Sequence, residues 1–131
     1  DATTRGFLHS HSYTGSALAC RAALASLDLF ESGDVLNKNR ERAQRFTQRC
    51  EPLATHPKVL NARHMGQIWA FDVNTQDPAF SREFFARGLD QGLLIRPIGN
   101  TLYFMPPYVT GVDEFAALVG ACVRILDGMA I

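Results

Sequence analysis

The sequence predicts an α+β fold in which helices pack on one face of a small, mostly antiparallel sheet. First, apolar residues recur at helical spacing in four stretches, which cover residues 15–30, 35–53, 79–90 and 111–126. Second, short apolar stretches bounded by turn residues come in two pairs, at 59–63 with 67–73 and at 93–96 with 101–105. Third, the order of these elements is two helices, a strand pair, a helix, a strand pair and a helix, which is typical of an α+β layer.

The composition is that of an ordinary globular protein of one-domain size. The chain has 131 residues, of which 47% are hydrophobic and 20% charged, so it can bury a real core. The formal net charge is zero, which argues against a nucleic-acid-binding surface. No apolar run approaches the ~20 residues of a membrane-spanning helix. Widely spaced cysteines at positions 20, 50 and 122 indicate reduced thiols, and we expect a cytoplasmic protein.

The two N-terminal helices differ in character. The first, with the sequence SALACRAALASLDLF, is rich in alanine and leucine, and we expect it to be buried on most sides. Gly33 ends it, and Asp34 can cap the helix that follows. That second helix is rich in charge and has one stripe that faces the core, formed by Leu36, Ala43, Phe46 and Cys50.

The later elements supply the rest of the predicted core. The strand at 67–73 is apolar almost throughout, so we expect Trp69 in the core and Asp72 as a satisfied carboxylate at the strand end. His64 is interpreted as a histidine of a turn or of the core edge. The last two helices are expected to point a set of apolar side chains inward: Phe80, Phe84 and Leu89, then Phe115, Leu118, Val119, Cys122 and Ile125.

One arginine is a candidate for binding a substrate. Arg96 lies at the end of an apolar stretch in the segment GLLIRPIGNTLYFMPPY, residues 92–108, and Pro97 restricts its backbone to extended geometry. A planar guanidinium held in this way suits a two-point contact with a carboxylate. An exposed arginine at a strand end is the alternative interpretation. The residues alone leave both open.

The segment before the first helix is a candidate anion site. Ser12, Tyr13, Thr14 and Gly15 place hydroxyl groups and a glycine at a helix N-terminus, where free backbone N–H groups and the helix dipole favour negative charge. From periodicity alone we favour the simpler interpretation, an ordinary N-cap by a hydroxyl at position 12 or 14. His9 and His11 have no obvious third ligand nearby, so we predict no metal site.

The residues provide no candidate nucleophile. We find no Ser-His-Asp arrangement, Cys-His pair, phosphate-binding loop or GxGxxG motif. The only lysines are Lys38 and Lys58, and neither lies where a buried Schiff-base lysine is expected. The sequence therefore supplies candidate binding groups and no catalytic residue.

Three segments resemble the C-terminal region of class III aminotransferases, the fold-type I enzymes that use pyridoxal phosphate: FLHSHSYTGSALACRAALASLDLF, NARHMGQIWAFDV and LLIRPIGNTLYFMPPY. Within the class they are most similar to the branch that makes 7,8-diaminononanoate in biotin biosynthesis. The pattern RP-x-G-x-x-x-Y-x-MPPY is the most specific part. The resemblance implies the small C-terminal domain of a fold-type I transferase at 34–131. Residues 1–33 would be the end of the large domain and a connecting helix.

The resemblance also implies roles for individual residues. The Ser12 hydroxyl, assisted by backbone N–H groups around Tyr13, would bind the phosphate of pyridoxal phosphate held by the other subunit of a homodimer. Arg96 would hold the carboxylate of the keto acid, 8-amino-7-oxononanoate, with S-adenosylmethionine as amino donor. In the family the Schiff-base lysine lies upstream of these segments. We therefore expect a C-terminal part of a larger enzyme that is inactive alone. Ser16 and Ala17 replace the family's usual Asn-Pro, which bears on helix entry only.

Two alternatives stay open at this point. The first is another class III aminotransferase, one that acts on an ω-amino acid. The second is a free-standing module that has kept the small-domain fold and acts in binding or assembly without catalysis.

Overall fold

The structure, a computed structural model, describes residues 12–130. The chain divides into two compact units, Asp1–Leu36 and Asn37–Ile131. The proposed assignment of residues 1–33 to the end of a large domain stays a prediction.

Helix α1, Ala17–Ser32, forms most of the described part of the first unit. Its N-cap is Ser16, whose side chain accepts a hydrogen bond from the Ala19 N–H at 3.5 Å, so the predicted cap at position 12 or 14 is wrong. None of the sixteen helical residues is buried. Leucines 18, 24, 27 and 29 are all exposed, by 55 to 86%. The prediction of a buried helix is therefore wrong for the described chain, because no described surface covers these side chains.

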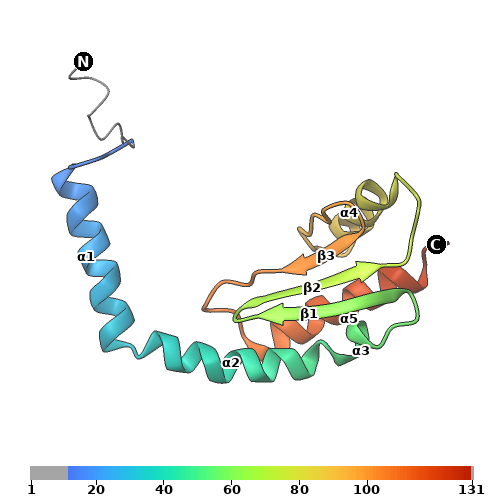
Figure 1. Ribbon diagram of the computed structural model, residues 1–131, viewed down its shortest axis with the longest axis horizontal. Coiled ribbons are helices and arrows are strands. Elements are labelled where there is room, and N and C mark those ends of the chain that lie inside the picture. The colour runs from blue at the N-terminus through green and yellow to red at the C-terminus, as the bar shows by residue number, and fades with distance from the viewer. Residues whose placement is uncertain (1–11, 131) are drawn as a thin grey trace, which may run out of the picture. The chain divides into compact units, whose positions relative to one another are not determined.

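The second unit contains a three-stranded antiparallel sheet in the order β1-β2-β3 (Figure 1). The strands are β1, Val59–Met65; β2, Ile68–Val73; and β3, Thr101–Phe104. Gly66 closes the tight β1–β2 hairpin with a φ of 57°, which a residue with a side chain rarely adopts. The predicted small antiparallel sheet is confirmed.

Four helices accompany the sheet: α2, Val35–Arg49; α3, Glu51–Ala54; α4, Phe80–Asp90; and α5, Val112–Asp127. Helix α5 contacts both α3 and α4, and it lies along one face of the sheet (Figure 1). The single helix predicted at 35–53 is divided at Cys50, and Pro52, which lacks a backbone N–H, lies at the start of α3.

An aromatic cluster forms the centre of the core. The Phe115 ring of α5 stacks on Phe46 of α2 at 4.1 Å between centroids. It also meets Trp69 at 5.2 Å and the edge of Phe104 at 5.7 Å. Trp69 is 2% exposed, which confirms its predicted core position. The rings thus join the sheet to α2 and α5.

The other predicted core residues are confirmed, with two exceptions. Buried side chains include Phe80, Phe84, Val119, Cys122 and Ile125, while Ala43 and Leu118 pack against them partly buried. Leu36 and Leu89 are 58% and 49% exposed, so their predicted core positions are wrong. Leu36 lies at the start of α2 and Leu89 at the end of α4. At these helix ends the apolar stripe extends beyond the part of the helix that packs against the core.

The strand predicted at 93–96 does not form. In the described chain this segment has no ladder partner, and only an isolated bridge between Ile98 and Thr101 lies near it. The segment is bonded to α4 instead. The Leu93 N–H donates to the Gly88 carbonyl at 2.8 Å, and the Ser81 hydroxyl donates to the Pro97 carbonyl at the same distance.

Candidate functional site

Arg96 lies on the extended segment between α4 and β3. Its neighbours Ile95 and Pro97 are buried, whereas the Arg96 side chain is exposed. The guanidinium carbon lies 5.8 Å from the centroid of the Phe85 ring, within the range of a cation–π contact. Arg96 forms no hydrogen bond or ion pair with any residue that the structure describes. Its N–H groups are therefore available to an external acceptor.

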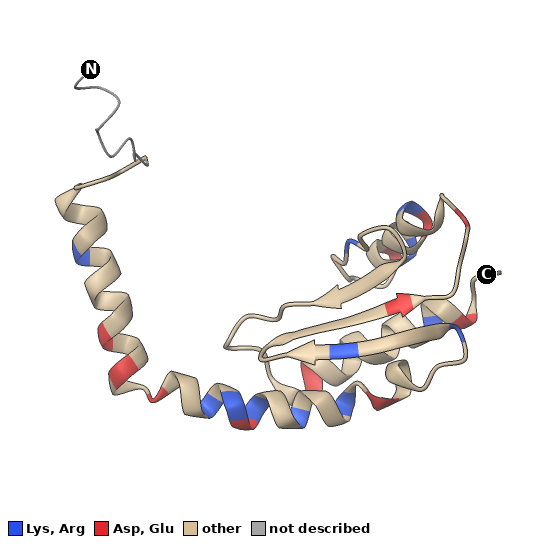
Figure 2. Ribbon diagram, in the orientation of Figure 1, with Lys and Arg blue, Asp and Glu red and all other residues tan. Residues whose placement is uncertain are grey.

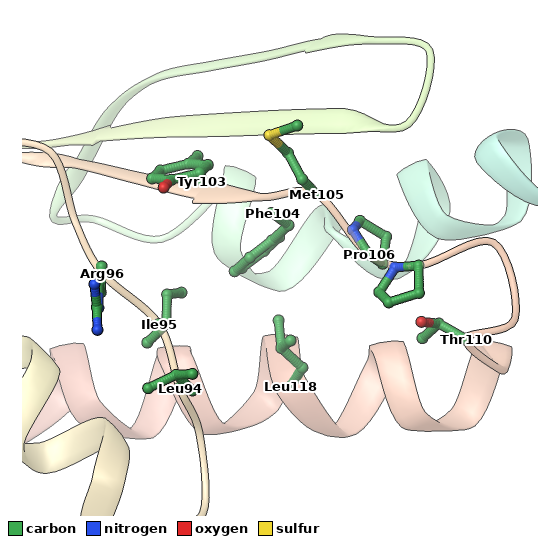
Figure 3. Close-up of a pocket in the computed structure, with 10 residues that line it drawn as sticks. Leu94, Ile95, Arg96, Tyr103, Phe104, Met105, Pro106, Thr110 and Leu118 are labelled. Carbon is green, nitrogen blue, oxygen red and sulfur yellow. The ribbon is translucent and has the colours of Figure 1, made fainter. Parts of the chain in front are cut away.

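A hollow of about 380 Å³ adjoins Arg96. Apolar side chains such as Ile95, Phe104 and Leu118 line most of it. In Figure 3, Arg96 lies at one end of the hollow and Thr110 at the other. A cation at the end of a mainly apolar hollow suits a ligand with a carboxylate and a hydrocarbon body.

The predicted cofactor-binding residues lie in a turn just before α1. Tyr13 and Gly15 have φ values of 68° and 72°, and the Ser16 N–H donates to the Tyr13 carbonyl at 3.0 Å. The side chains of Ser12 and Tyr13 are exposed. Neither the Ser12 hydroxyl nor the Tyr13 N–H forms a hydrogen bond with a described residue. Two donors are thus free to bind an anion such as phosphate.

The predicted site residues belong to two separate units of the chain. Ser12 and Tyr13 belong to the first unit and Arg96 to the second.

The Asp72 carboxylate on β2 is engaged in a cross-strand cluster and has a structural role. Arg63 donates to its Oδ2 at 2.7 Å and Thr101 to its Oδ1 at 2.7 Å, while Asn61 adds a bond at 3.1 Å. The hydrogen bonds from Arg63 and Thr101 hold the pKa of the Asp72 carboxyl below its ordinary value. This confirms the prediction of a satisfied carboxylate.

The lysines and buried cysteines provide no nucleophile among the described residues. Lys58 Nζ donates to the carbonyls of Leu126 and Met129 at 2.7 and 2.6 Å, so it closes the C-terminal end of α5. Burial raises the pKa of the Cys50 and Cys122 thiols to about 12 each, which keeps them protonated.

The most basic described element, α2, lies outside the Arg96 hollow. Lys and Arg residues gather along it (Figure 2). Lys38, Arg42 and Arg45 line a smaller hollow of about 200 Å³ with Glu41. Lys38 is exposed at this surface, whereas a Schiff-base lysine is expected in a buried site.

Sequence reasoning missed Phe85 and Ser81 of α4. Both contact the segment that carries Arg96, through the ring and the hydroxyl described above. The available signal was their spacing: residues 81 and 85 are four apart, and so lie on one face of the predicted helix. The sequence did not indicate that this face contacts Arg96, because residues 93–96 were expected to pair with another strand.

Comparison with known proteins identifies the family. Residues 2–126 match the family described as "Aminotransferase class-III". The chain belongs to the class III aminotransferases. The adenosylmethionine-8-amino-7-oxononanoate aminotransferase of Helicobacter pylori is 41% identical over 128 residues, and the enzyme of the same name from Synechococcus elongatus is 38% identical over 126 residues. These matches cover 94% and 92% of this chain and 29% of each relative.

Solved structures show the same fold. The crystal structure of an enzyme of that name from Methanocaldococcus jannaschii matches with a TM-score of 0.85 at 23% identity. The match covers 99% of this chain and 32% of the other. This confirms the predicted fold class, the small α+β domain of a class III aminotransferase.

Two searches of the described residues gave negative results. No described helix is long and apolar enough to cross a membrane. Among residues 12–130 there is no group of three or more histidine, cysteine or acidic side chains that could hold a metal ion. His9 and His11 lie outside the described residues.

Proposed function

We propose that the full-length protein carrying this chain transfers an amino group from S-adenosylmethionine to 8-amino-7-oxononanoate and so makes 7,8-diaminononanoate for biotin biosynthesis. The observation that carries the proposal is the 41% identity with the Helicobacter pylori enzyme named for these compounds. The position of Arg96, a cation without a counterion among the described residues at the end of an apolar hollow, supports it. The keto acid has the matching chemistry, a carboxylate on a hydrocarbon chain.

Pyridoxal phosphate is the proposed cofactor, and the residues present fit its phosphate. Ser12 and Tyr13 are exposed in a turn at the start of a helix, and the Ser12 hydroxyl and the Tyr13 N–H form no hydrogen bond with a described residue. In the proposal they bind the phosphate across the interface of a cytoplasmic homodimer. When bound, the cofactor supplies an electron sink that stabilises a developing carbanion.

Arg96 is proposed to bind and orient the keto acid. A bidentate contact between a guanidinium and a carboxylate is worth roughly 1.5–3 kcal/mol, which corresponds to about ten- to a hundredfold in affinity. Such a contact selects and places the substrate but does not replace a covalent step. The chain therefore contributes binding groups, and we expect no amino transfer by these 131 residues alone.

A comparison of amino donors tests the proposed reaction. The full-length protein, saturated with pyridoxal phosphate, is given S-adenosylmethionine or β-alanine, and the new amine on 8-amino-7-oxononanoate is quantified by mass spectrometry. We expect product with S-adenosylmethionine. Failure of this donor would reject the biotin-pathway assignment.

A second candidate is an ω-amino acid aminotransferase. The beta-alanine–pyruvate aminotransferase of Pseudomonas aeruginosa is 28% identical to this chain over 127 residues. Transfer from β-alanine to pyruvate, without transfer from S-adenosylmethionine, would favour this second function.

A further inference from the structure

We propose that helix α4 positions the Arg96 guanidinium for its substrate, through a stripe formed by Ser81, Phe85 and Gly88. The inference rests on the proposed function, in which Arg96 binds the carboxylate of the keto acid. It adds two positioning residues, Ser81 and Phe85, which act through Arg96. It also gives Gly88 a role, because the absence of a side chain there allows the segment that carries Arg96 to pack closely on α4.

The three residues lie on one side of the helix. Positions 81, 85 and 88 are separated by four and three residues, the spacing that stacks side chains along one stripe of an α-helix. Helix α4 spans Phe80–Asp90, so the stripe runs along nearly its whole length.

The stripe contacts the Arg96 segment in reverse order. Ser81 donates its hydroxyl to the Pro97 carbonyl at 2.8 Å. The Phe85 ring lies 5.8 Å from the Arg96 guanidinium carbon. Gly88 accepts the Leu93 N–H at 2.8 Å. Residues nearer the start of the helix thus contact residues nearer the end of the segment. The helix and the segment therefore run antiparallel along their contact.

Gly88 allows the close approach. A Cβ built at this position would lie 3.2 Å from the Leu93 carbonyl oxygen and 3.2 Å from a methyl carbon of Ile95. Both distances are tighter than ordinary van der Waals contact. A side chain here would press the segment away from the helix, so the absence of one keeps the Arg96 backbone close to α4.

No strand ladder holds this segment in the described chain. Residues 93–96 have no sheet partner, and the first bridge comes at Ile98. An extended segment without a ladder needs other contacts to fix its direction. The contacts with α4 supply them on both sides of Arg96, at Leu93 and at Pro97.

Phe85 fixes the orientation of the charged group. The ring lies within cation–π range of the guanidinium, which leaves the N–H edge of the planar group free. A bidentate carboxylate contact uses that edge. Holding Arg96 in one orientation lowers the conformational entropy that it loses when the carboxylate binds.

The kinetic test uses Phe85→Leu, Phe85→Tyr and Ser81→Ala in the full-length protein. Loss of the ring should raise the KM for 8-amino-7-oxononanoate by about two- to fivefold. The kcat should stay unchanged, because a contact that is equally strong in the ground and transition states affects the KM only. Phe85→Tyr keeps an aromatic face and should restore the wild-type KM. Ser81→Ala should change the same parameter in the same direction, and Leu89→Ala, at an exposed position of the same helix, is the matched control.

A structural readout tests the contact independently of activity. Crystal structures of the full-length protein with Phe85 and with Phe85→Leu should show a displaced or disordered Arg96 guanidinium in the variant and an ordered one in Phe85→Tyr. A guanidinium that stays in place in Phe85→Leu overturns the inference.

The variant Arg96→Lys separates this failure from a failure of the proposed function. If Arg96→Lys raises the KM for the keto acid and Phe85→Leu does not, α4 has no positioning role and the inference alone is wrong. If neither raises it, Arg96 does not bind the keto acid, and the proposed role of Arg96 fails together with the inference.

Discussion

Replacing Phe115 by leucine should lower the free energy of unfolding of the second unit by a measurable amount, while an apolar side chain still fills much of the space of the ring. Phe115 is 0% exposed and touches three other rings, at 4.1, 5.2 and 5.7 Å between centroids. Each aromatic pair contributes roughly 0.5–1.5 kcal/mol beyond the burial of its area, and the pairs are not fully additive. We therefore expect a loss of about 2 kcal/mol for Phe115→Leu, against about 3–5 kcal/mol for Phe115→Ala.

Urea unfolding followed by the fluorescence of Trp69 measures this loss. Trp69 is the only tryptophan of the chain and lies in the same ring cluster, so its signal reports the core directly. With a urea slope of about 1–2 kcal/mol per molar, the midpoint should fall by about 1–2 M. Leu60→Ala, at a position 67% exposed on β1, is the control and should leave the midpoint almost unchanged. A Phe115→Leu midpoint within 0.2 M (roughly) of the wild type would refute the assigned core.

Other substitutions test the remaining contacts. The pKa of Asp72 is lowered in the folded chain, so its carboxylate stabilises the fold above the ordinary pKa of 3.8, and this stabilisation is lost as the pH falls through the folded pKa. Asp72→Asn should therefore destabilise the chain at pH 7. In urea unfolding, the midpoint of this variant should fall less steeply at acid pH than that of the wild type. Cys20 is exposed while the other two thiols are buried, and one thiol per native chain should therefore react with a thiol reagent at pH 7.5 (roughly); the reaction should disappear in Cys20→Ser. Lys58→Met removes two hydrogen bonds at the end of α5 and should cost about 2 kcal/mol by urea unfolding, whereas Lys38→Met should cost nearly nothing.

The fold could be predicted from the sequence where local pattern and tertiary packing agree. The almost continuous apolar run of β2 and the apolar stripe of α5 each predict a buried element, and the structure buries Trp69 and Phe115. Prediction failed where burial depends on a second surface. The apolar composition of α1 indicates a covered helix, but the described residues do not provide the cover.

The segment with Arg96 shows a different limit. Its apolar residues predict a strand, because periodicity does not report whether a ladder partner or a helix satisfies the backbone. Here α4 supplies the contacts, through a serine hydroxyl and a glycine carbonyl. Arg96 itself could be selected from its flanking residues, whereas Phe85 could not, since its role depends on that unexpected packing.

The central claim is that Arg96 binds the carboxylate of the substrate. The most direct measurement compares the KM of the full-length protein for 8-amino-7-oxononanoate and for its methyl ester, in the wild type and in Arg96→Lys, with Arg82→Lys as a control on the exposed side of α4. The account predicts that the wild type and the control prefer the acid by about tenfold or more, and that Arg96→Lys loses most of this preference, because lysine cannot form the two-point contact. An equal preference for the acid in Arg96→Lys and in the wild type would contradict the account.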